Sequence, residues 1–147
     1  MRWFLLIVAM IGALYLWARH VAVSGDEQTA FDAVEQGNTG LLARELDHGV
    51  DVNTSRFMQG QTLLMAAATS GHADAVRELL ARGANPDRGN DVGFTPMMTA
   101  AARGHTDVVR ILVRSGATTR GTSPAGKTAV VMAKDCGHEE VVAVLSP

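Results

Sequence analysis

Residues 121–128, "GTSPAGKT", have the residue types and the spacing of a phosphate-binding loop. They match the pattern G-x-x-x-x-G-K-S/T, in which backbone N–H groups surround phosphates, the lysine reaches the terminal phosphates and the hydroxyl binds Mg²⁺. Taken alone, the match predicts a nucleotide-binding enzyme in which Lys127 holds phosphate. That chemistry also requires a parallel β-strand before the loop and a sheet around it. The sequence continues from Thr128 only to Pro147, which leaves little room for such a sheet.

Three histidines recur at equal intervals along the chain: His72, His105 and His138. Recurring histidines could hold a metal ion, but equivalent positions in stacked repeats lie about 8–10 Å apart. Zinc binds its ligand atoms at about 2.0–2.1 Å, so one ion could not reach two of them. We therefore expect structural histidines. Cys136 is the single cysteine, which excludes an intramolecular disulfide and a cysteine zinc cluster. With no nucleophile elbow and no acid pair in a cleft, the sequence predicts a protein without catalytic residues, metal or cofactor.

The elements that carry these residues repeat along the chain. Thr62, Thr95 and Thr128 recur at the same interval as the histidines, and so do the pairs Gly71-His72, Gly104-His105 and Gly137-His138. Threonine before each apolar run is typical of a helix N-cap, and Pro96 suits the first helical position. Gly126 corresponds to Gly60 and Gly93, so "GTSPAGKT" is better explained as a loop that enters a repeat helix. Helices this short must be stabilised by stacking on their neighbours.

The units "QTLLMAAATSGHADAVRELLARGANPD" and "FTPMMTAAARGHTDVVRILVRSGATTR" resemble the ankyrin-repeat family, whose pattern begins T-P-L-H-x-A-A. The resemblance implies an all-α solenoid of about four helix–turn–helix repeats with hairpin loops. We expect repeats over about 26–58, 59–91, 92–124 and 125–147, together forming a domain over 25–147. The chain departs from the family pattern at Met65, Met98 and Val131, where the family has histidine.

Residues 1–24 form a separate segment. Between Arg2 and Arg19 lies the run "WFLLIVAMIGALYLWA", which contains no charged residue. As a helix it would be about 24 Å long, and its terminal aromatic residues suit membrane interfaces. Apolar residues surround the whole helix, which disfavours the further alternative of a buried core helix. We expect a transmembrane signal-anchor helix over 1–24; the alternative is a signal peptide cleaved after Ser24. Both predict that the repeats lie outside the cytoplasm, at a bacterial inner membrane or in the periplasm, and a cytosol-facing adaptor on the same anchor is the remaining alternative.

The remaining function is binding. A net charge of −2 disfavours a nucleic-acid partner, and we expect no small-molecule substrate. The family resemblance implies binding of another protein through the hairpin tips and the first helices; an envelope protein stabilised or inhibited by this module is the expected partner. Phe94 and Met58 are the most informative positions of this surface, because they are apolar. The full set that the resemblance assigns to it is Met58, Gln59, Gln61, Thr69, Ser70, Asp91, Val92, Phe94, Ala102, Arg103, Pro124, Ala125, Lys127, Asp135 and Cys136.

Overall fold

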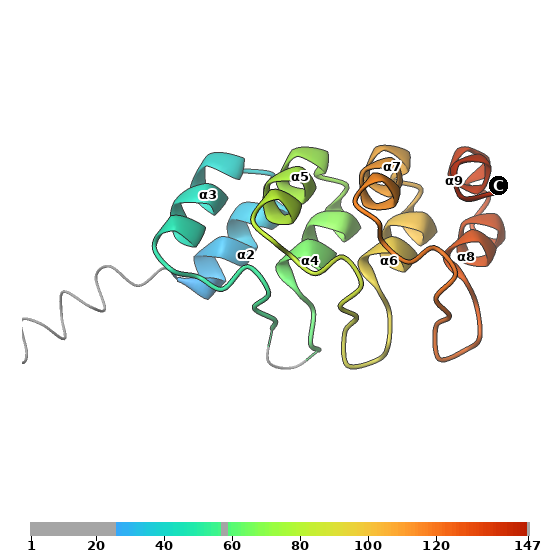
Figure 1. The fold of residues 1–147 in the computed structure, drawn as a ribbon, viewed down its shortest axis with the longest axis horizontal. Helices are drawn as coiled ribbons and strands as arrows, with labels where there is room; N and C mark the ends of the chain where they lie inside the picture. Colours follow the sequence, from blue (N-terminus) through green and yellow to red (C-terminus); the bar gives the residue numbers. More distant parts are fainter. Residues whose placement is uncertain (1–25, 57–58, 147) are drawn as a thin grey trace, which may run out of the picture.

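The computed structural model describes residues 26–56 and 59–146, which form eight α-helices and two isolated antiparallel β-bridges. This confirms the predicted all-α architecture of helix–turn–helix units (Figure 1). The helices are α2 (Glu27–Glu35), α3 (Thr39–Asp47), α4 (Leu63–Ser70), α5 (Ala73–Ala81), α6 (Pro96–Arg103), α7 (Thr106–Arg114), α8 (Ala129–Asp135) and α9 (Glu139–Leu145). The predicted membrane helix over 1–24 lies outside the described residues. Within the described residues, no helix combines the length and the apolar character needed to cross a bilayer.

The helices stack in two rows. The first helices of the repeats, α2, α4, α6 and α8, form one row, and the second helices form the other (Figure 1). Hairpin loops project together from the side of the first row. Each first helix packs against its own second helix and against the first helices of adjacent repeats. The stack therefore extends in one direction, with a row of hairpins along its length.

Each first helix begins at a side-chain cap. The hydroxyls of Thr62, Thr95 and Thr128 accept hydrogen bonds from the backbone N–H three residues later. The first repeat has no threonine there, and Asp26 replaces it by accepting from the N–H of Gln28. Pro96 occupies the first turn of α6, where its missing N–H costs no intrahelical bond. The predicted caps are confirmed, and they fix where each helix leaves its hairpin.

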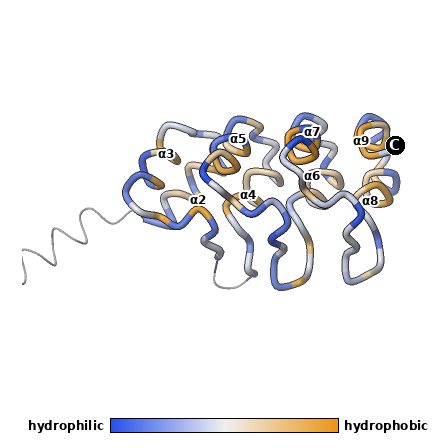
Figure 2. Tube along the Cα trace, in the orientation of Figure 1, coloured by the Kyte–Doolittle hydropathy of each residue, from blue (hydrophilic) through white to orange (hydrophobic). Residues whose placement is uncertain are grey.

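The core lies between the two rows. Alanines on the first helices are fully buried, with Ala67 and Ala100 at 0% exposure, and Leu79 and Leu112 on the second helices are equally buried. The small side chains allow α4 and α6 to pack directly against each other. Apolar residues accordingly concentrate on the helices, while the hairpins are more polar (Figure 2).

The recurring histidines join neighbouring repeats. The Nε2 atom of His105 donates to the carbonyl oxygen of Thr69 in the preceding repeat, with 3.0 Å between the two atoms. His72 and His138 make the corresponding bonds at 3.0 and 3.1 Å. The predicted structural role of the histidines is confirmed. The imidazole of His105 lies so close to Gly71 that a Cβ atom there would come within 2.6 Å of the ring, and Gly71 also has a φ of +76°. Both features require glycine at this turn.

The first repeat is closed by a buried carboxylate. Glu45 occupies the position that corresponds to Leu79 in the next repeat, and it is 5% exposed. Its Oε2 accepts a hydrogen bond from the backbone N–H of Asp26 at 3.0 Å, and its Oε1 pairs with Arg44 at 3.1 Å. The bond from Asp26 is the main reason that the pKa of Glu45 lies below its usual value. The carboxylate therefore holds the start of α2 against α3.

Candidate protein-binding surface

We call the hairpin tips together with the exposed sides of the first helices the hairpin surface. Asp91 and Val92 are exposed at the tip of one hairpin, and the side chain of Val92 is 57% exposed although it is apolar. Met58 lies outside the described residues. The other predicted positions that are exposed are Gln59, Ser70, Arg103, Pro124, Ala125, Lys127, Asp135 and Cys136, while Gln61, Thr69 and Ala102 are half-buried.

Hydrogen bonds hold the hairpins in place. Asn90 closes its hairpin twice, since its backbone N–H donates to the carbonyl of Phe94 and its side chain accepts from the Phe94 N–H, both at 2.9 Å. The N–H of Asp91 donates to the carbonyl oxygen of Gln59 in the preceding hairpin at 3.2 Å. These two hairpins are therefore linked by a backbone hydrogen bond.

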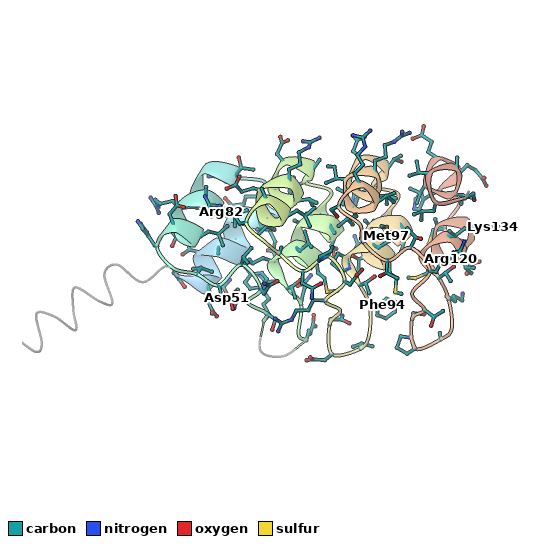
Figure 3. The ribbon with its side chains drawn as sticks, in the orientation of Figure 1. Asp51, Arg82, Phe94, Met97, Arg120 and Lys134 are labelled. Carbon is teal, nitrogen blue, oxygen red and sulfur yellow. The ribbon has the colours of Figure 1, made fainter. Side chains whose placement is uncertain are left out.

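Phe94 does not project from the stack. The structure places it half-buried at the base of its hairpin, packed against the core near α6 (Figure 3). Its ring covers apolar core atoms below it and offers a partner only part of its surface, so its place in the binding surface stays a prediction. Val92, two residues earlier, is the exposed apolar side chain of this hairpin.

Lys127 and Asp135 form an ion pair across the length of α8. The Lys127 Nζ atom lies 2.6 Å from Asp135 Oδ2, and this hydrogen bond is the main reason that the pKa of Lys127 is raised. Both side chains remain about half exposed, at 52% and 50%, so the pair adds little to stability. The sequence predicted both residues on the surface but not their pairing, because their separation is not one that brings two side chains together on a helix.

The groups that would hold phosphate in "GTSPAGKT" are engaged within the repeat. The N–H groups of Ser123, Gly126 and Lys127 donate to acceptors inside the same loop. The Thr128 hydroxyl caps α8, and Lys127 pairs with Asp135. Thr122 and Thr128 form an antiparallel bridge rather than a strand–loop–helix unit. The loop is a repeat hairpin, so a nucleotide-hydrolysing function is not favoured.

Sequence reasoning missed a cluster at the N-terminal end of the hairpin surface. The guanidinium of Arg56 lies over the ring of Phe31, 4.5 Å from its centroid, and Arg56 also pairs with Glu35 at 2.7 Å. Arg56 comes from a hairpin, whereas Phe31 and Glu35 come from α2. The residues are far apart in the sequence and share no motif, so only the fold brings them together. Among the described residues, no group of three histidine, cysteine, aspartate or glutamate side chains could hold a metal ion.

Several curated proteins are similar to parts of this chain. Ankyrin repeat domain-containing protein 29 from Homo sapiens is 51% identical over 57 residues, which are 38% of this chain and 19% of that protein. Ankyrin repeat, SAM and basic leucine zipper domain-containing protein 1 from Ovis aries is 44% identical over 59 residues, 40% of this chain and 12% of that protein. Mitochondrial disaggregase from Bos taurus is 34% identical over 83 residues, 56% of this chain and 12% of that protein. The chain thus matches less than a fifth of each relative.

A family model described as ankyrin repeats (3 copies) matches residues 30–122 and 82–147, which together include nearly all of the described part of the chain. The match agrees with the helix pairs, the threonine caps, the hairpins and the histidine bonds between repeats. The chain therefore belongs to the ankyrin-repeat family.

Proposed function

We propose that this chain is a non-catalytic binding module that is exported, tethered to the membrane by its N-terminal segment, and bound to an envelope protein through the hairpin surface. The ankyrin repeats mark the chain as a protein–protein interaction module. The envelope partner, which the module would stabilise or inhibit, and the tether are the proposed parts of the function.

The exposure of Val92 is the observation that supports this use of the hairpin surface. An apolar side chain that is 57% exposed at a hairpin tip gains little packing from its own fold and offers contact area to a partner. Arg103, at the end of α6 in the same repeat, is exposed and makes no ion pair with any described residue. Arginine is among the residue types enriched at interfaces.

Changing Val92 to aspartate and Arg103 to glutamate is expected to weaken partner capture by about 2 kcal/mol of binding free energy, because both changes place a carboxylate where the partner would contact the surface. The full chain would be cross-linked in native membranes, the captured protein identified by mass spectrometry, and its affinity measured for each variant. The thermal midpoint should change little, since both side chains point into solvent.

Arg110→Glu is the matched control. Arg110 is also an exposed arginine without an ion pair to a described residue, but it lies on α7, in the row of second helices. It should leave capture unchanged. Loss of capture in Arg110→Glu, with full capture in the Val92 and Arg103 variants, would move the interface to the second helices and contradict the proposal.

The charge-free run before Arg19 supports export. A reporter that is active only outside the cytoplasm, fused to the C-terminus, is expected to give a signal. The mass of the mature chain then distinguishes a retained anchor from a signal peptide cleaved after Ser24. Activity only from a reporter that needs the cytosol would overturn export and leave a cytosol-facing adaptor.

A further inference from the structure

The last repeat presents a face that the internal repeats bury. Residues at equivalent positions of successive repeats can be compared directly, and four apolar positions that are buried in the third repeat open in the fourth. Met98 is 2% exposed, whereas Val131 is 41% exposed. The other three pairs are Met97 with Val130, Val109 with Val142 and Leu112 with Leu145, buried in the third repeat and half-buried in the fourth. We call Val130, Val131, Val142 and Leu145, with the polar residues beside them, the end face.

The change concerns only one side of the repeat. Ala100 and its counterpart Ala133 are both 0% exposed, and Val108 and Val141 are also both 0% exposed. Positions that pack inside a repeat or onto the preceding one thus stay buried. The positions that open are those that a following helix pair covers in the internal repeats. The end face is therefore a docking side for helices, left uncovered within the described part of the chain.

Two cationic residues near the C-terminal end of the stack occupy positions at which an earlier repeat contacts the repeat that follows it. Lys134 is exposed at the position where Ala101 is fully buried. Arg120 occupies the position of Asp87, whose carboxylate accepts hydrogen bonds from the N–H and hydroxyl of Thr118 in the next repeat at 2.7 and 2.9 Å. A guanidinium can only donate hydrogen bonds, so Arg120 cannot hold a backbone N–H as Asp87 does. Lys134 lies on α8, and Arg120 lies beside this helix (Figure 3).

A cavity of about 360 Å³ adjoins this face, and Arg120 is the one charged residue among its lining side chains. The apolar lining consists of Val113, Val130, Val144 and Leu145. Two carboxylates of the last repeat are engaged elsewhere. Asp135 is paired with Lys127, and Glu140 accepts from the Thr106 hydroxyl of the preceding repeat at 3.3 Å. The end face thus combines apolar side chains with two cations that pair with no described carboxylate.

The positive charges of Arg120 and Lys134 limit which kind of partner can bind the end face. Two copies that met through their end faces would bring four cations together, which disfavours a symmetric dimer. At the other end of the described stack, the half-buried Thr29 and Asp32 stand where the next repeat has the buried Leu63 and Ala66, so polar side chains replace apolar ones there and that end does not match the apolar end face. Helices already cover the same face between repeats, so a helix is the shape that fits, and the cations require carboxylates on its flanks.

We propose that the end face binds an amphipathic α-helix of another protein, with an apolar stripe over Val131, Val142 and Leu145 and acidic side chains against Arg120 and Lys134. This interface is separate from the hairpin surface, and it would let the module contact two partners at once. It does not depend on the function assigned to the hairpins.

Two synthetic helical peptides test the proposal. They share one leucine stripe and carry either glutamate or lysine on its flanks, and their binding to the full chain in zwitterionic lipid nanodiscs is measured by fluorescence anisotropy. The glutamate peptide is expected to bind at least about tenfold more tightly than the lysine peptide, and the double change Arg120→Glu and Lys134→Glu should reverse this preference. Arg110→Glu with Arg114→Glu makes the same change in net charge on α7 and should leave the preference intact.

Equal affinity for the two peptides, binding of neither, or a preference that survives the double charge reversal would each overturn the proposal. So would a concentration-dependent dimer that Val131→Asp abolishes, because a second copy would then cover the face. Binding to anionic vesicles that is lost in the charge-reversed variant, with no peptide preference, would assign the face to a membrane surface instead.

Discussion

Leu79→Ala is expected to lower the free energy of unfolding by about 2–5 kcal/mol. Leu79 is 0% exposed on α5, in the middle of the stack, where repeats on both sides prevent the cavity from closing. The loss combines the removed apolar contact with the remaining void. Urea unfolding of the full chain, followed by far-ultraviolet circular dichroism, measures it.

Leu145→Ala is the matched control, because Leu145 occupies the same position in the last repeat but is only half-buried. Its cost should be clearly smaller than that of Leu79→Ala. If the two changes cost the same, Leu145 is packed as tightly as an internal leucine, and the described difference between internal and terminal repeats is incorrect.

Gly71→Ala is expected to cost about 2–4 kcal/mol, from backbone strain together with the loss of a hydrogen bond between repeats. The residue has a φ of +76°, which alanine adopts only with strain, and its new Cβ would lie 2.6 Å from the imidazole of His105. The ring would have to leave the carbonyl oxygen of Thr69. Equilibrium unfolding in urea again measures the loss.

The control Gly83→Ala separates the backbone strain from the loss of the hydrogen bond between repeats. Gly83 has a φ of +88°, but no other group lies within 4 Å of the place that a Cβ atom would take, so only the backbone strain applies, at about 1–2 kcal/mol. In a His105→Ala background, the cost of Gly71→Ala should fall toward the Gly83→Ala value. A cost that stays unchanged without the histidine would show that the close approach of the ring contributes nothing.

The sequence predicted the helix pairs, their caps and the turns because each depends on residues close together in the chain. Thr95 before Pro96 and the fixed spacing of the Gly-His pairs are local signals, and the period aligned them across repeats. The same alignment correctly placed "GTSPAGKT" in a hairpin. Local chemistry repeated at a constant interval was enough to specify the architecture.

The candidate surface was less predictable because it depends on side-chain directions. Phe94 and Val92 are both apolar and both in one hairpin, yet only Val92 points into solvent. No periodicity distinguishes them, since hairpin residues follow neither helix nor strand spacing. The pairing of Arg56 with Phe31 and Glu35 likewise joins segments that are distant in the sequence. Such contacts follow from the stacking itself.

The histidine bonds have a consequence for how the gene could change in length. Each histidine reaches the carbonyl of the unit directly before it, and the helices that pack extensively belong to the same repeat or to adjacent repeats. A tandem duplication of the segment coding for residues 59–91 would therefore insert a complete repeat. Its histidine would donate to the carbonyl of the repeat before it, and its own Thr69 carbonyl would accept from the histidine of the repeat after it. The inserted unit would leave Glu45 at one end and Lys134 at the other in their present surroundings. Recombination can lengthen or shorten this protein in whole units while the two terminal units keep their distinct sequences.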